Sequence, residues 1–186
     1  MLDLATANIL VAYGTLFLML ASAGLFLGTL YPGLTPEWKQ NFHAKHGLWV
    51  AFGFALVATL VTLYYSEVLG QAPCSWCWVQ RIFLYPQVVI FGLAAFMKDS
   101  RAVWYSVALS ILGAVVALYH HWLQMGGSDF FPCPASGPGP ACEIPTFITW
   151  GFITFPFMAL VLFIFLILYV LWLRMLWRKY PQGEGA

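Results

Sequence analysis

The sequence predicts an all-α integral membrane protein, and three observations lead to this fold class. Hydrophobic residues make up 62% of the 186 residues and charged residues only 8%, whereas about 25% of residues are charged in soluble proteins. The apolar residues fall into five runs, each close to the roughly 20 residues that a helix needs to cross the bilayer. All four cysteines lie in the polar breaks between these runs.

The five runs are expected to form helices over residues 8–30, 47–65, 82–97, 103–122 and 150–173. The first run lacks the basic n-region of a secretion signal and is too long for one, so we interpret it as a retained helix. The third run is short and is expected to begin inside the preceding loop. Because no stretch remains for a soluble domain, the chain is predicted to be one membrane domain whose backbone hydrogen bonds close within each helix.

The distribution of basic residues predicts the orientation. A net charge of +1 gives no support for nucleic-acid binding. Five spans place the two termini on opposite sides. Apart from Arg81 at the mouth of the third predicted helix, all lysine and arginine residues lie on the side of the C-terminus. Basic loops favour the cytoplasm, so the N-terminus and both cysteine loops are expected outside, where disulfides persist. The basic residues of the cytoplasmic side are Lys39, Lys45, Lys98, Arg101, Arg174, Arg178 and Lys179.

The first cysteine pair, Cys74 and Cys77, forms a C-x-x-C motif directly before a predicted membrane helix. Two intervening residues suit a reversible disulfide, and a helix N-terminus lowers the pKa of a thiol. Cys77 is expected to be the more activated thiol, because Arg81 lies one helical turn further on. A guanidinium beside a thiol can stabilise a thiolate or the oxygen of a reduced acceptor.

The second pair, Cys133 and Cys142, lies in a loop rich in glycine and proline that is expected to be extended and mobile. A mobile pair suits a relay in which a thiolate must reach a disulfide on another protein. Two other interpretations stay open, namely two inert structural disulfides or a zinc site. A c-type haem is less favoured, because Cys77 is not followed by histidine.

A thiol relay of this kind needs a final electron acceptor. A disulfide near about −300 mV lies about 180 mV below a strongly oxidising thiol oxidase, which is about 8 kcal/mol for two electrons. A relay made of protein alone would therefore stall. The chain has no nucleotide-binding fingerprint, so a membrane quinone is the favoured acceptor. His120 and His121 close the fourth predicted helix on the thiol side, where they and Arg81 can bracket a quinone headgroup.

The cysteine motif and its surroundings resemble the DsbB family of disulfide-bond formation proteins, in particular its BdbC-like branch. The resemblance covers roughly residues 73–165. Its most specific parts are the segments CSWCWVQRIFLYP at 74–86, ALYHHWLQ at 117–124 and WGFITFP at 150–156, together with the Cys133 and Cys142 loop.

The resemblance implies a quinone-dependent thiol oxidase in the bacterial cytoplasmic (inner) membrane that reoxidises a DsbA-like thioredoxin-fold partner. Cys133 would form the mixed disulfide with the partner, and Cys142 would resolve it through an interloop disulfide with Cys74. Electrons would then reach Cys77, which faces ubiquinone or menaquinone. Arg81 matches the family's quinone-contacting arginine, while His120 resembles the histidine of the quinone site and Gln80 occupies a neighbouring position.

The family resemblance also implies a four-transmembrane-helix bundle, to which this chain adds one N-terminal transmembrane helix. The expected division is an extra helix and cytoplasmic loop at 1–46, the bundle at 47–174 and a cytoplasmic tail at 175–186. The segment between Cys133 and Cys142 is short for the membrane-lying helix that some members carry. A reductase for exported disulfides would need a cytoplasm-facing thiol pair, and the sequence offers none. The remaining alternative is a structural or metal-binding protein whose cysteine pairs are permanently bridged or ligated. No metal is expected in the favoured reading.

Overall fold

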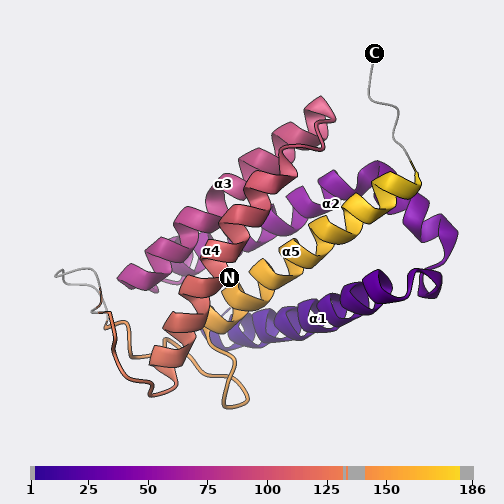
Figure 1. Ribbon diagram of the computed structural model, residues 1–186. Helices are drawn as coiled ribbons and strands as arrows, with labels where there is room; N and C mark the ends of the chain where they lie inside the picture. Colours follow the sequence, from indigo (N-terminus) through magenta and orange to yellow (C-terminus); the bar gives the residue numbers. More distant parts are fainter. Residues whose placement is uncertain (1–2, 132, 134–140, 181–186) are drawn as a thin grey trace.

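The computed structural model describes residues 3–131, 133 and 141–180, and these residues form a helical protein (Figure 1). A 3-10 turn, η1 (Pro32–Leu34), follows the first long helix, and a π-helix, η2 (Tyr64–Val68), extends the second. All five long helices are long and apolar enough to cross a membrane, which confirms the predicted fold class. The long helices are α1 (Leu4–Leu30), α2 (Glu37–Leu63), α3 (Ser75–Met97), α4 (Val103–Gln124) and α5 (Phe155–Lys179).

The last four helices form the bundle, and α1 is added on its outside. Each of α2, α3 and α4 packs against the next helix in the chain, and the contact between α2 and α5 closes the bundle. Helix α1 packs against α5. The most apolar part of α5 is 56% buried, whereas that of α1 is only 11% buried. Helix α5 therefore forms the centre of the protein, and most of the surface of α1 is left for lipid.

Small residues allow the helices of the bundle to approach closely. One face of α2 carries small buried residues at helical spacing, and these pack in the core with α5. On α4, the backbone at Gly113 lies directly against the ring of Phe163, which is fully buried on α5. The small residues of the α2 face are Ala44, Gly47, Ala51 and Ala55.

Substituting Gly113 by alanine is expected to destabilise the bundle. The new Cβ would lie 2.5 Å from the Phe163 ring, so the ring or the α4 backbone must move. Overpacking of this kind typically costs about 1–3 kcal/mol. A thermal unfolding experiment in detergent should give a lower Tm for Gly113→Ala than for Gly53→Ala, whose new Cβ meets nothing within 4 Å. Equal Tm values for the two variants would contradict this packing.

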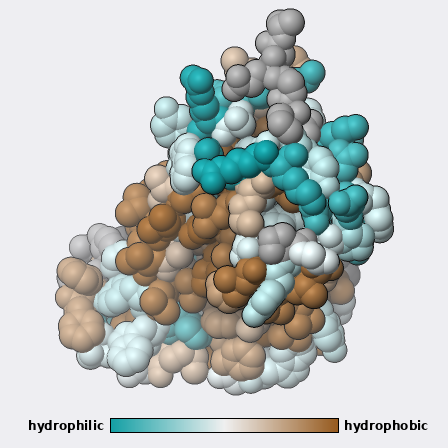
Figure 2. All heavy atoms as spheres, turned by 45° about the vertical axis from the view of Figure 1, so that its right-hand side comes forward, coloured by the Kyte–Doolittle hydropathy of each residue, from teal (hydrophilic) through white to brown (hydrophobic). Residues whose placement is uncertain are grey.

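The two ends of the bundle differ in character. Figure 1 places the start of α1, the α2–α3 connection and the long α4–α5 connection towards one end, and the end of α5 with the α1–α2 and α3–α4 connections towards the opposite end. In Figure 2, hydrophilic residues gather near the C-terminus, above a largely apolar flank. Apart from Arg81, the basic residues thus lie at the end away from the cysteine loops. The assignment of the two ends to the two sides of a membrane stays a prediction.

Several helix boundaries differ from those expected, most clearly in α2 and α5. Helix α2 begins at Glu37 rather than at residue 47, so part of the segment expected as a cytoplasmic loop is helical. Helix α5 begins at Phe155 rather than at residue 150, because the Thr154 side chain caps it and Pro156 favours a first turn. It continues to Lys179, past the expected start of the tail. An apolar run marks only the part of a helix that lies in hydrocarbon, which explains why α2 starts before its run and α5 ends after its run.

Candidate redox site

The first cysteine pair is built by the start of α3. Cys74 is the N-cap residue, and its Sγ accepts a hydrogen bond from the backbone N–H of Cys77 at 3.4 Å. The two Sγ atoms lie 2.9 Å apart, and both cysteines are free thiols. Both cysteines therefore lie at the N-terminus of α3, where the positive end of the helix dipole points at the two sulfur atoms.

The second pair packs directly on the first. Cys133 and Cys142 form a disulfide in the α4–α5 connection. Cys142 is buried in one cluster with Cys74 and Leu123, and Cys77 and Cys133 pack against this cluster. The fold thus brings all four predicted cysteines together at one end of the bundle, although the two pairs are far apart in the sequence. Residues 132 and 134–140 of this loop, which is expected to be extended and mobile, lie outside the described residues.

His120 links the two pairs. Its side chain is fully buried, and its Nε2 lies 3.5 Å from the Cys74 Sγ and 3.2 Å from the carbonyl oxygen of Cys142. Its Nδ1 lies 3.0 Å from the Nε2 of Gln80. If the Gln80 amide donates to Nδ1, the proton of the neutral ring is on Nε2 and is donated to the sulfur and the carbonyl.

Hydrogen bonding makes Cys74 the better stabilised thiolate. The hydrogen bond with Cys77, and then that with His120, lower the pKa of Cys74 from 9.0 to about 4, although burial acts in the opposite direction. This result differs from the expectation that Cys77 is the more activated thiol. The reason is that the Cys74 sulfur, at the N-cap, accepts bonds from the backbone, from the second thiol and from His120.

Arg81 is a buried cation held by neutral oxygens. It donates to the Thr62 carbonyl oxygen at 2.9 Å and to the Ser66 hydroxyl at 3.3 Å, and its guanidinium lies 5.0 Å from the centre of the Trp78 ring. Within the described part of the chain, no carboxylate lies in salt-bridge distance of Arg81. A buried charge without a counter-ion is costly, so this position favours an anion or a developing negative charge nearby.

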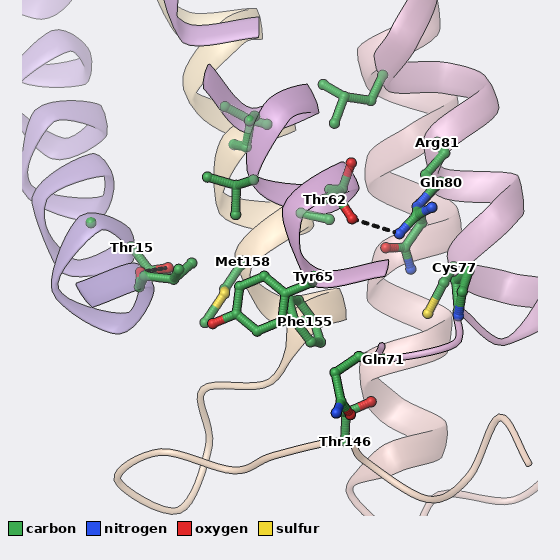
Figure 3. Close-up of a pocket in the computed structure, with 18 of the residues that line it drawn as sticks. Thr15, Thr62, Tyr65, Gln71, Cys77, Gln80, Arg81, Thr146, Phe155 and Met158 are labelled. Carbon is green, nitrogen blue, oxygen red and sulfur yellow. Dashed lines mark hydrogen bonds between the residues drawn. The ribbon is translucent and has the colours of Figure 1, made fainter. Parts of the chain in front are cut away.

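A cavity of about 440 Å³ opens beside these groups. Cys77, Gln80 and Arg81 lie on its α3 side, and Figure 3 shows them opposite Thr15 of α1. The rest of the lining is mostly apolar and comes largely from α1, α2 and α5, with further residues from α4 and from the two loops that carry the cysteines. Of the three predicted quinone-binding residues, Gln80 and Arg81 line the cavity, whereas His120 lies beside Cys74 and is not among the lining residues.

Gln124 is a lining residue that the sequence interpretation did not single out. Its Oε1 is buried and has no hydrogen-bond partner among the described residues, while its Nε2 lies 3.3 Å from the Nε2 of His120. Its position one turn after His120 on α4 was the signal that could have identified it. A buried unpaired acceptor beside the cysteines is available to a ligand or to water.

The same groups offer one possible metal geometry. Ligand atoms of Cys74, Cys77 and His120 all lie within 4.8 Å of one another. Two thiolates and an imidazole are a ligand set that zinc accepts, and such a site keeps a fourth position open. The metal-binding alternative therefore concerns these three residues, and not the disulfide-bonded second pair.

A helix-capping thiol pair, a loop disulfide packed on it and an adjoining membrane cavity define a membrane thiol–disulfide oxidoreductase. The family described as "Disulfide bond formation protein DsbB" matches residues 44–173. The chain belongs to the DsbB family, whose members are disulfide bond formation proteins. The matched part includes both cysteine pairs and most of the bundle, but not α1.

Curated relatives agree with this family. The chain is 40% identical over 125 residues to "Probable disulfide formation protein C 1" of Bacillus anthracis, covering 64% of this chain and 86% of the relative. It is 39% identical over 130 residues to "Disulfide bond formation protein C" of Bacillus subtilis, covering 68% and 91%. No solved structure matches the chain.

Proposed function

We propose that the protein is a quinone-dependent thiol oxidase that reoxidises a DsbA-like thioredoxin-fold partner. The observation that carries this proposal is the cavity in which a cysteine, Cys77, and a buried cation, Arg81, share one wall. An apolar cavity within a membrane bundle suits a lipid-soluble acceptor, and the cation suits an acceptor that becomes negatively charged. Ubiquinone and menaquinone both have this chemistry.

The arrangement of the sulfurs supports a route for the electrons. A thiolate of the partner attacks the Cys133–Cys142 disulfide at Cys133, and Cys142 leaves as a thiolate. The second partner thiolate then releases Cys133, so the partner gains its disulfide and this pair is reduced. Exchange with a Cys74–Cys77 disulfide passes the two electrons to Cys74 and Cys77 by way of a Cys142–Cys74 bond. The quinone takes up two electrons and two protons, and the Cys74–Cys77 disulfide forms again.

The neighbouring residues have distinct roles in this route. Both thiols of the first pair line the cavity, and Cys77, one helical turn from Arg81, is the thiol proposed to lie next to the acceptor. Arg81 stabilises negative charge on the acceptor oxygen. His120 acts on the sulfurs rather than on the acceptor, since its Nε2 lies within hydrogen-bond distance of the Cys74 sulfur and of the Cys142 carbonyl oxygen. The tautomer with its proton on Nε2 donates to both. Gln80 holds the His120 ring in this tautomer.

The proposed location is the bacterial cytoplasmic membrane, with the cysteine loops and the N-terminus outside and the C-terminus in the cytoplasm. The separation of the cysteine loops from the basic end of the bundle supports this orientation. An oxidising compartment is also where a thiol oxidase has its substrates.

Anaerobic mixing of the purified protein with a reduced thioredoxin-fold partner and a quinone tests the proposal. We expect one quinone to be reduced for each partner dithiol that is oxidised, followed by quinone absorbance and by thiol titration. Partner thiols that persist while quinone is present would refute it. The structural or metal-binding alternative instead requires thiols whose number does not change with quinone, or metal bound in equal amount to the protein.

A further inference from the structure

Helix α1 lies outside the part of the chain that matches the DsbB family, yet it forms one wall of the cavity. Figure 3 shows α1 facing α3 across the cavity, with Thr15 pointing between them. The α1 wall is continuous over more than two turns of the helix. Its lining residues are Leu10, Val11, Gly14, Thr15, Phe17 and Leu18.

The polarity of the cavity changes from the α3 wall to the α1 wall. The α3 wall offers the Cys77 thiol, the Gln80 amide and the Arg81 guanidinium. The hydroxyl of Thr15, the one polar side chain of the α1 wall, donates to the Val11 carbonyl oxygen at 2.9 Å. The α1 wall therefore presents hydrocarbon to an occupant, and it suits the apolar chain of a ligand whose polar head lies at α3.

A second hollow of about 590 Å³ lies between α1 and the end of α2. It shares lining residues with the cavity, so the two hollows are neighbours. At its rim, the Tyr65 hydroxyl donates to the Asn8 side-chain oxygen at 2.9 Å, which joins η2 to α1. The lining of both hollows is mostly apolar, so together they can hold a long hydrocarbon chain. The shared residues are Leu10, Val11, Val57, Val61 and Tyr65.

We propose that α1 forms the binding site for the apolar isoprenoid tail of the quinone, which leaves the cavity between α1 and α2. This inference rests on the proposed function and deepens it, because it assigns to the additional helix a part in recognising the acceptor. The tail contributes affinity by burying hydrocarbon against α1, while the headgroup is recognised at α3.

Two glycines of α1 provide a matched test. Gly14 lines the cavity, and a Cβ added there meets nothing within 4 Å. Gly24 lies on the same helix, is equally open and is not a lining residue. Tryptophan at Gly14 would fill the space for the tail, whereas tryptophan at Gly24 would not.

The measurement compares two quinones with the same headgroup, one with a long isoprenoid tail and one without a tail. In Gly14→Trp, the ratio of the KM for the long-tail quinone to the KM for the tail-less quinone should rise at least about tenfold. This is the loss of affinity expected when about two methylene groups of the tail are no longer buried against apolar surface. In Gly24→Trp, the ratio should equal that of the wild type. Equal ratios in both variants, or an unchanged ratio in Gly14→Trp, would overturn the inference.

A second measurement uses the unaltered protein and does not depend on the folding of a variant. A quinone with a photoreactive group on its tail should label residues of α1, and labelling confined to α2–α5 would overturn the inference. The proposed function fails separately, because the wild-type protein would then reduce neither quinone. Reduction of both quinones without any contribution from α1 would leave the proposed function standing and refute only the tail site.

Discussion

In the Cys77→Ser variant, the rate of quinone reduction is expected to fall to the rate measured without the protein. Serine cannot form the disulfide with Cys74, so the two electrons have no route to the acceptor. The cavity itself should persist, because the hydroxyl is smaller than the thiol and Cys77 is only partly buried. Quinone absorbance under anaerobic conditions, with a reduced thioredoxin-fold partner as donor, measures the loss.

The substitution Cys133→Ser is the matched comparison, because it removes a cysteine of the other pair. It should block oxidation of the partner to the same extent. When a small dithiol reduces Cys74 and Cys77 directly, however, Cys133→Ser should still reduce quinone, whereas Cys77→Ser should not. Loss of both reactions in both variants, or retention of partner oxidation in either, would contradict the order of the relay.

The sequence predicts the parts of this site that depend on local patterns. A C-x-x-C motif before an apolar run places Cys74 and Cys77 at a helix start, and the structure has Cys74 as the N-cap of α3. Helical spacing then puts Arg81 one turn from Cys77, and both residues line the cavity. Five apolar runs likewise predict five spanning helices, because the hydrocarbon thickness alone fixes their minimum length.

Features that depend on packing between distant segments are not predictable in this way. Adjacent histidines on one helix point in different directions, so His120 contacts the cysteines whereas His121 bonds the Thr154 hydroxyl at 3.0 Å. Which of them meets sulfur depends on the rotation of α4 against α3 and on the fold of the second loop. The position of α1 beside the cavity is set by its contact with α5. An almost uniformly apolar helix shows no preferred face in its sequence.

Removing the His120 ring is expected to raise the pKa of Cys74, which is about 4 in the reduced protein. Because this pKa lies below the ordinary value, the thiolate predominates between pH 4 and pH 9. The hydrogen bonds to this thiolate therefore stabilise the folded protein fully above the ordinary pKa of 9.0, and this contribution is lost as the pH falls through about 4. Hydrogen bonds to a charged group are worth about 1.5–3 kcal/mol, so His120→Phe should raise the midpoint by about 1 to 2 pH units.

The midpoint should remain well below 9, because the hydrogen bond with Cys77 is the larger cause of the shift and is kept in the variant. Thiolate ultraviolet absorbance as a function of pH, taken as the difference from the same protein carrying Cys74→Ser, measures it. His121→Phe is the matched control, since His121 bonds Thr154 and not the sulfurs, and its midpoint should equal that of the wild type. A purely structural role for His120 would lower stability in His120→Phe without moving the midpoint, and that result would remove His120 from the relay. If instead the midpoint rises, exchange between the two cysteine pairs should slow most steeply at acidic pH, where Cys74 becomes protonated.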